Sequence, residues 1–187
     1  NSIRNDYAAA IKKIYAHGIM IQAFFLFGYE YDTADVFDQT IEFALQHKFF
    51  LAGFNTLTPQ PGTRLYQRYQ QEGRLLQESW WLNEKYKYGE VMFRPENMSP
   101  DRLKEGCIRA RKKFYTYSQI INRALNRRAT LCNLKNLGTH FAANMIARRE
   151  ILQKIKKIQA CNLQSVNGLT TGTEYENPHR AAGRTAA

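Results

Sequence analysis

The chain has 187 residues, of which 44% are apolar and 13% aromatic, so it can bury a hydrophobic core and is not a disordered polar tract. Its 11 glycines, 5 prolines and 3 cysteines exclude collagen-like and disulfide-rich scaffolds. The net charge of +11 is concentrated in residues 102–158, which carry 15 basic and 2 acidic side chains, whereas residues 1–101 carry 10 basic and 12 acidic ones.

The N-terminal segment predicts a helix followed by a buried strand. Ser2 can cap the helix and Gly18 ends it. Residues 19–27 are apolar at both alternating positions, which is typical of a strand covered on both faces. The apolar face of the helix is formed by Ile3, Tyr7, Ile11 and Ile14.

A second helix and a second strand are expected directly afterwards. Asp32 or Thr33 can cap a helix that runs to about His47, and the apolar stretch Phe49–Leu57 reads as another buried strand. Helices that alternate with buried strands indicate parallel βα units, whose strands all end at one edge of the sheet. The predicted fold class is therefore α/β.

The second half of the sequence is predicted to be mainly helical. A short helix is expected over residues 64–72, and residues 90–94 could form a short strand or an extended segment. Ser99, followed by Pro and Asp, is a strong helix start. One long helix is expected from there to Leu125, with the basic side chains largely off its apolar face, and another over residues 139–158. The apolar face of the long helix would contain Leu103, Cys107, Ala110, Phe114, Tyr117, Ile121 and Leu125.

Ligands of α/β proteins bind at the carboxyl ends of the strands, so the two loops that follow the strands are the first candidate sites. The loop at residues 28–33 offers the carboxylates of Glu30 and Asp32, which could bind hydroxyl groups or act as a general base. Alternatively, Asp32 only caps the next helix and Glu30 is solvated. The loop at residues 58–63 has two prolines and a glycine, so its path is stiff, and it either holds a site or simply turns the chain.

The sequence contains no recognisable metal-ligand spacing. Cys107, Cys132 and Cys161 are 25 and 29 residues apart, which matches no zinc or iron–sulfur pattern, and Cys107 is expected in the core. The four histidines are expected to cap helices or to be solvated. An odd number of cysteines and the lack of a secretory pattern or a long apolar run favour a cytoplasmic protein without a membrane span. The absence of an initiator Met suggests a piece of a longer protein.

Four motifs in order give a resemblance to a known family. They are GYEYDT at residues 28–33, LTPQPGTRLY at 57–66, EGRL at 72–75 and FRP at 93–95. In this order they resemble the C-terminal part of radical S-adenosylmethionine (SAM) proteins, closest to those that carry a cobalamin-binding domain ahead of the radical SAM domain. The resemblance covers about residues 1–128.

The resemblance implies late βα units of a partial (βα) barrel followed by a helical C-terminal extension. Residues 1–97 would belong to the barrel and 98–160 would form a basic helical extension. Residues 161–187 are expected to be a disordered tail because their end is rich in Gly, Thr, Asn and Ala. Members of the family use SAM and a 4Fe–4S cluster, and cobalamin-associated ones often transfer methyl groups. The cluster loop would lie in a missing N-terminal part, so the isolated chain would be inactive. Its substrate, a small molecule or a lipid, is left open.

The resemblance also implies which residues of this chain face the cofactor. The backbone around Leu26 and Gly28 would face SAM, Glu30 stands where the cobalamin-associated subset commonly has Asp, and the next strand would line the site with Asn55, Leu57 and Thr58.

An alternative follows from the charge distribution alone. The basic helices at residues 102–158, with aromatic side chains among the Lys and Arg residues, could form a non-enzymatic module that binds nucleic acid or another polyanion.

Overall fold

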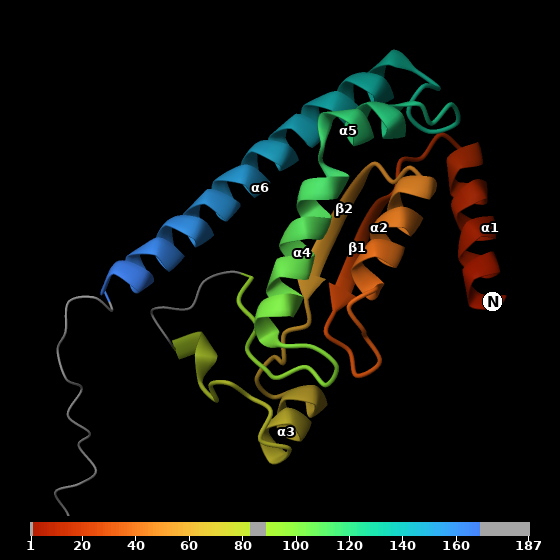
Figure 1. Ribbon diagram of the computed structural model, residues 1–187. Coiled ribbons are helices and arrows are strands. Elements are labelled where there is room, and N and C mark those ends of the chain that lie inside the picture. The colour runs from red at the N-terminus through yellow and green to blue at the C-terminus, as the bar shows by residue number, and fades with distance from the viewer. Residues whose placement is uncertain (1, 83–88, 169–187) are drawn as a thin grey trace, which may run out of the picture. The chain divides into compact units, whose positions relative to one another are not determined.

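The computed structural model describes the backbone of residues 2–82 and 89–168 and the side chains of 6–82 and 89–156 (Figure 1). Two compact units divide the chain at Ile151 and Leu152, and the first contains both strands. Within the described residues, no helix is both long enough and apolar enough to span a bilayer. The elements are α1 (Ser2–Ala16), β1 (Gln22–Phe27), α2 (Val36–Gln46), β2 (Leu51–Thr56), α3 (Arg64–Gln71), the 3-10 helix η1 (Trp80–Leu82), α4 (Pro100–Phe114), α5 (Tyr117–Ala124) and α6 (Leu134–Gly168).

The sheet consists of the parallel pair β1 and β2, in which Phe24 is opposite Gly53 and Leu26 opposite Asn55. Helices α2 and α4 contact the strands and each other, and Figure 1 shows them side by side along the sheet. The expectation of an α/β fold with parallel strands is confirmed. The partial barrel and the boundaries at residues 97 and 160 stay predictions.

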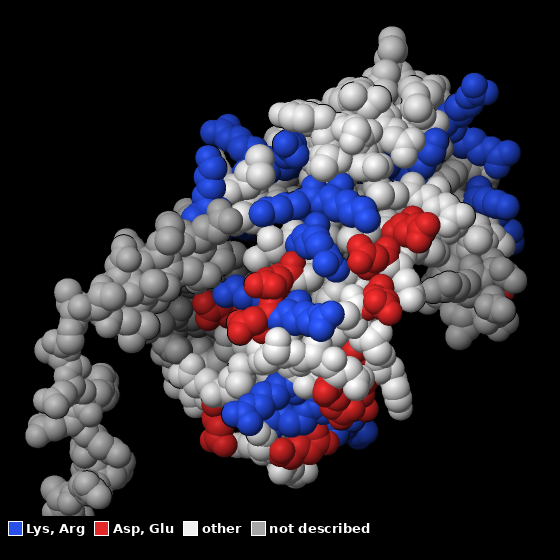
Figure 2. All heavy atoms as spheres, in the orientation of Figure 1, with Lys and Arg blue, Asp and Glu red and all other residues white. Residues whose placement is uncertain are grey.

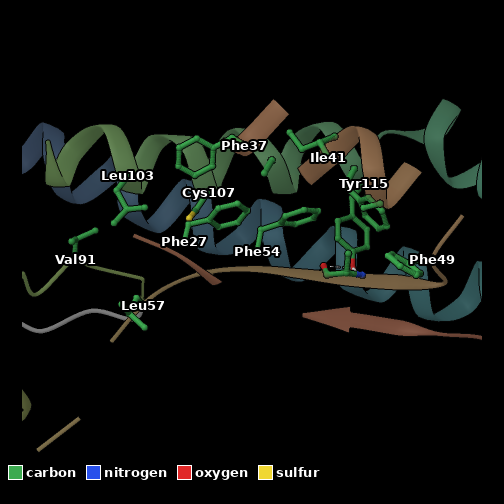
Figure 3. Close-up of a cluster of buried hydrophobic side chains, with 14 of the residues drawn as sticks. Phe27, Phe37, Ile41, Phe49, Phe54, Leu57, Val91, Leu103, Cys107 and Tyr115 are labelled. Atoms are coloured by element: carbon green, nitrogen blue, oxygen red, sulfur yellow. Dashed lines mark hydrogen bonds between the residues drawn. The ribbon is translucent and has the colours of Figure 1, made fainter. Parts of the chain in front are cut away.

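The core lies between one face of this sheet and the two helices (Figure 3). The ring of Phe54 is 5.5 Å from that of Phe25 and 5.5 Å from that of Phe114 on α4. Phe27 is 4.8 Å from Phe37 of α2. Clustered aromatic rings bury a large apolar area each, so these contacts account for the tight docking of α2 and α4 on the sheet.

The opposite face of the sheet is exposed, contrary to the expectation that both faces of the strands are covered. Phe24 is 67% exposed and Leu26 48% exposed, whereas Phe27 and Phe54 are buried. Side chains alternate between the two faces of a strand, so the exposed set is Gln22, Phe24 and Leu26 of β1 together with its neighbours on β2. The strands carry apolar side chains on both faces of the sheet, but the described residues cover only one of these faces.

The prediction of one helix from Ser99 to Leu125 is wrong, because the helix breaks after Phe114. Ser99 does cap α4, accepting a hydrogen bond from the backbone N of Arg102 at 3.2 Å. A second N-cap follows at Thr116, whose Oγ1 accepts from the backbone N of Gln119 at 3.4 Å and starts α5. Threonine followed by glutamine three residues later is a capping-box pattern, which competes with helix continuation.

Two other expected boundaries also differ. Helix α2 begins at Val36 with Asp35 at its N-cap position, so neither Asp32 nor Thr33 caps it. Helix α6 begins at Leu134 and continues to Gly168, so it is longer at both ends than residues 139–158. The rest of the expected tail, residues 169–187, lies outside the described residues.

Candidate functional site

The predicted site residues lie at the carboxyl ends of the two strands. The backbone N of Leu57 donates to the carbonyl of Phe27 at 2.8 Å, which extends the pairing of the strands to the two loops. The loop after β1 and the loop after β2 therefore begin side by side, as the parallel arrangement predicts. Leu26, Gly28 and Glu30 come from the first strand and its loop, and Asn55, Leu57 and Thr58 from the second.

Leu26 and Asn55 are register partners on the exposed face of the sheet. Two residues earlier, Phe24 is the register partner of Gly53. A Cβ on Gly53 would lie 2.7 Å from Cδ1 of Phe24, so the absence of a side chain at this position lets the ring of Phe24 lie over β2. The exposed face consequently presents an apolar surface, Phe24 and Leu26, next to the amide of Asn55.

The turn after β1 is held by Asp32. Gly28 has a φ of +106°, and its backbone N donates to Oδ2 of Asp32 at 2.8 Å, as does the N of Tyr29 at 3.0 Å. A Cβ on Gly28 would lie 2.8 Å from Phe93 and 2.9 Å from Leu103, so only glycine fits here. Asp32 thus shapes the loop rather than capping α2.

The Glu30 side chain points to α3, where its carboxylate forms an ion pair with the guanidinium of Arg68. The carbonyl of Glu30 accepts a hydrogen bond from Nδ2 of Asn97 at 2.6 Å. These contacts fix the loop at residues 28–33 to α3 and to the segment before α4. The carboxylate is therefore not simply solvated.

The loop after β2 is organised by its own hydroxyl groups and glycine. Thr63 Oγ1 donates to the carbonyl of Gln60 at 2.7 Å and accepts from the N of Tyr66 at 3.2 Å, so it caps α3, while Gly62 has a φ of +81°. Thr58 Oγ1 donates to the carbonyl of Thr56 at 3.4 Å, and Leu57 is buried. The motif at residues 57–66 is thus a structured turn into a capped helix.

The EGR motif has a structural role in this fold. The guanidinium of Arg74 lies 4.3 Å from the ring centroid of Tyr69 and pairs with Glu72 and Glu96 at 3.3 and 3.1 Å. Its Nε donates to the carbonyl of Arg94 at 3.0 Å. Arg74 therefore joins the end of α3 to the segment that leads to α4.

The outer edge of β2, away from β1, is covered by side chains that sequence reasoning missed. The hydroxyl of Tyr115 accepts from the N of Ala52 at 3.2 Å and donates to its carbonyl at 3.0 Å. Arg111 donates to the carbonyl of Phe54 at 2.9 Å and to Oδ1 of Asn55 at 3.1 Å. Burial is the main cause that raises the pKa of the Tyr115 phenol. We call Arg111, Tyr115 and Arg123 the edge seal.

Arg123 completes the edge seal from a fully buried position. Its Nη1 donates to the carbonyls of Phe49 and Phe50 at 3.0 and 2.9 Å, and its Nη2 to that of Phe114 at 3.1 Å and to Oδ1 of Asn144 at 3.0 Å. Burial lowers its pKa to about 10, so it is still a cation at neutral pH. The prediction that basic residues lie largely off the apolar face fails at this position.

The capping box at Thr116 and Gln119 is the signal that could have located the edge seal. Splitting the long helix there restarts its apolar periodicity and places Arg123 beside the buried Ile120 and Ala124. Arg111 and Tyr115, four residues apart, then share one side of the end of α4. The sequence offers no comparable signal for the strand atoms that these side chains bind.

Cys107 and Cys132, the two cysteines whose side chains are described, are not grouped with other metal-binding side chains. Cys107 is buried as predicted, and burial raises the pKa of its thiol to about 12. Cys132 is exposed, and the side chain of Cys161 lies outside the described residues. Within the described part of the chain, no three His, Cys, Asp or Glu side chains are grouped for a metal ion. The described residues therefore contain no ligand set for an iron–sulfur cluster.

Among the histidines, His140 departs from the expected capping or solvated role. It is fully buried, with Nε2 3.0 Å from the carbonyl of Ile120. A buried nitrogen at this distance from a carbonyl must donate, so neutral His140 carries its proton on Nε2. His47 does lie at the end of α2, as expected.

Comparisons with known proteins give one family and two relatives. The family described as "Domain of unknown function (DUF4070)" matches residues 63–160, more than half of the chain. The bacteriochlorophyllide d C-8(2)-methyltransferase of Chlorobaculum tepidum is 25% identical over 166 residues, which cover 89% of this chain and 36% of that protein. The bacteriochlorophyllide d C-12(1)-methyltransferase of the same organism is 30% identical over 123 residues, covering 66% and 26%. No solved structure matches the chain.

Proposed function

Because the chain belongs to the DUF4070 family, a domain of cobalamin-associated radical SAM proteins, we propose that it works as the C-terminal portion of a radical SAM enzyme. The predicted relation to the C-terminal part of these proteins is confirmed. The chain spans 36% and 26% of the length of the two curated relatives it matches, so the activity of the whole protein is part of the proposal. We assign it methyl transfer, the reaction class in the names of both relatives.

One structural observation carries the proposal: among the described residues, side chains cover the outer edge of β2, whereas no strand pairs with the outer edge of β1. The edge seal covers the outer edge of β2 and leaves no room there for another strand. On β1, Phe24 and Leu26 are exposed. Earlier strands would therefore add to β1 and curve over its exposed face. This is how the last two strands of a partial (βα) barrel are expected to look when the other strands are absent.

The exposed face also suits part of SAM. Phe24 and Leu26 offer an apolar surface on which an adenine ring could lie, and the side-chain amide of Asn55, whose Oδ1 accepts from Arg111, lies beside it. The tight turn at Gly28 brings backbone close to the same edge. We propose that Leu26, Gly28, Asn55, Leu57 and Thr58 line the SAM side of the site, while Glu30 orders the loop through Arg68.

The 4Fe–4S cluster would be held entirely by the missing N-terminal part, since the cysteines of this chain lack its spacing. When bound, the cluster supplies the electron that cleaves SAM. Residues 1–97 are then barrel, residues 98–160 the helical extension that seals it, and residues 161–187 a tail. A cobalamin cofactor and a cytoplasmic location belong to the same proposal.

The test compares the chain with a longer form that contains its upstream reading frame. After anaerobic reconstitution with iron and sulfide, the longer form should show 4Fe–4S absorbance and bind SAM, and the chain alone should show neither. In the longer form, Asn55→Ala should weaken SAM binding by about tenfold, the usual effect of losing a hydrogen-bonding side chain in a pocket. Gln22→Ala, on the same face at the other end of β1, should leave it unchanged. A longer form without a cluster would refute the proposal.

A further inference from the structure

An exposed apolar strip lies on α5 and the N-terminal part of α6. On α5 and at its C-cap, Tyr117, Ile121 and Leu125 are spaced by four residues and are 61%, 56% and 54% exposed. On α6, Phe141 and Met145 are also exposed and are four residues apart. These five residues are named the apolar strip. Monomeric proteins seldom leave five large apolar side chains together in water without a use for them.

The two parts of the apolar strip are adjacent. His140 lies 3.0 Å from the carbonyl of Ile120, so the helices pack directly at this level. The guanidinium of Arg148, which is on the same side of α6 as Met145, lies 4.2 Å from the ring centroid of Tyr117. The exposed sides of α5 and α6 therefore meet along one line.

Basic residues surround the apolar strip. Lys112 and Lys113 precede α5, Arg127 and Arg128 follow it, and Arg149 lies on α6; of these, Lys113 also pairs with Asp38 of α2 at 3.6 Å. Residues 106–149 contain no acidic residue at all. Figure 2 shows uncharged atoms over α5 with blue Lys and Arg atoms to both sides and below. This surface therefore has an apolar centre bordered by basic side chains. The arginines of the edge seal bind backbone carbonyls and are not part of this border.

We propose that the apolar strip and its basic border dock on the surface of an anionic lipid bilayer. Aromatic and aliphatic side chains bind at the boundary between headgroups and acyl chains, and Lys and Arg bind anionic headgroups, each strengthening the other. The apolar strip would enter the interface while α5 lies in its plane. This property is independent of the radical SAM assignment, since it uses none of the residues of that site.

Other occupants fit the surface less well. Nucleic acid would contact the basic border but would leave the aliphatic centre in water, because phosphates and sugars offer it no apolar partner. A second copy would bring two cationic borders together without an acidic residue between 106 and 149 to compensate. A bilayer that contains anionic lipid satisfies both the apolar centre and the charge.

The experiment measures binding of the full chain to vesicles by co-sedimentation. Vesicles of phosphatidylcholine alone are compared with vesicles that contain phosphatidylglycerol in addition. We expect the chain to bind the anionic vesicles at least about tenfold more tightly, as five exposed basic residues imply. Ile121→Ser with Leu125→Ser should weaken this binding by about tenfold or more, since two aliphatic side chains no longer leave water.

A matched control uses Leu76→Ser with Leu82→Ser, two leucines that are also exposed but lie outside the apolar strip. This pair should bind like the unchanged chain. Because a variant could unfold, Ile121→Trp provides a second measurement. Its fluorescence should be quenched by brominated lipid, whereas that of Leu76→Trp should not.

Four results would overturn the proposal. They are equal binding to neutral and anionic vesicles, no effect of the Ile121 and Leu125 substitutions, a chain dimer that these substitutions dissociate, and a longer form that no longer binds vesicles because upstream residues cover the strip. Binding to RNA in place of vesicles, unchanged by the two serines, would count for the polyanion alternative instead.

Discussion

Several arginine side chains of this protein bind backbone carbonyl groups inside the fold. Arg111, Arg123 and Arg148 belong to the basic segment, yet each donates to a backbone carbonyl, and Arg148 reaches that of Tyr115 at 2.5 Å. The net charge of the sequence includes these three arginines as if they were exposed to solvent. The structure uses them to satisfy carbonyl groups at the edge of β2 and the end of α4, which would otherwise lack partners. The cationic surface is therefore smaller than the sequence count implies.

Arg123 gives the sharpest test of this role. Arg123→Met should lower the free energy of unfolding by about 3 kcal/mol or more, because the carbonyls of Phe49, Phe50 and Phe114 would lose a charged donor in a buried place. Arg127→Met, at an exposed arginine four residues away, should change it by less than about 0.5 kcal/mol. Urea denaturation measures both. Equal effects of the two substitutions would show that the buried bonds do not stabilise the fold.

His140 makes the stability depend on pH. Burial is the main cause that lowers its pKa, and Arg123 lowers it further against the opposing bond to Ile120. The unfolded chain then binds a proton near the ordinary pKa of histidine, about 6.5, while the folded chain does not. Stability is therefore fully present above that pH and is lost as the pH falls below it.

The measurement is the urea midpoint at pH 7.5 and at pH 5.5. It should fall on acidification, and His140→Gln, which keeps a donor for the Ile120 carbonyl, should reduce the fall. A smaller fall should remain, because burial also lowers the pKa of His47. His17→Gln, at an exposed histidine, serves as control. An unchanged pH dependence in His140→Gln would contradict this assignment.

At the level of elements, the sequence predicted most helices and both strands but not how they end. Periodicity identified α1, α2 and β2 because each of them buries one face. It failed between α4 and α5, where the capping box of Thr116 outweighed a continuous apolar pattern. Local hydrogen bonds decide helix ends, and they are weak signals beside a long apolar repeat.

The contact between α2 and α4 depends on a missing side chain. Gly106 lies against the ring of Phe37, and a Cβ added there would collide with it. Gly106→Ala should therefore destabilise the fold by about 2 kcal/mol, as overpacking does. Gly138→Ala is the matched control in α6, where a Cβ would meet nothing within 4 Å. It should stabilise by up to about 1 kcal/mol through helix propensity. Thermal unfolding separates the two, and stabilisation by both would mean that α2 and α4 are not closely packed.

At the scale of the whole molecule, motif order predicted the family and the parallel sheet predicted where the loops meet. Leu26, Gly28 and Asn55 are indeed brought to one strand edge. The pairing of Glu30 with Arg68 and the β2 atoms that the edge seal binds could not be predicted, because these contacts join residues 38 or more positions apart with no local pattern. Long-range polar contacts of this kind are set by the fold and leave little trace in spacing.

The openness of the sheet on the β1 side is the central claim, and amide hydrogen exchange tests it most directly. The carbonyl of Phe27 faces β2, so by alternation the amides of Phe24 and Leu26 face away from it. These amides should exchange rapidly in the chain alone and become protected by about a hundredfold or more in the longer form, where an earlier strand pairs with β1. The amide of Ala52, bonded to Tyr115, should be protected in both. Rapid exchange at Phe24 and Leu26 in the longer form would contradict the account.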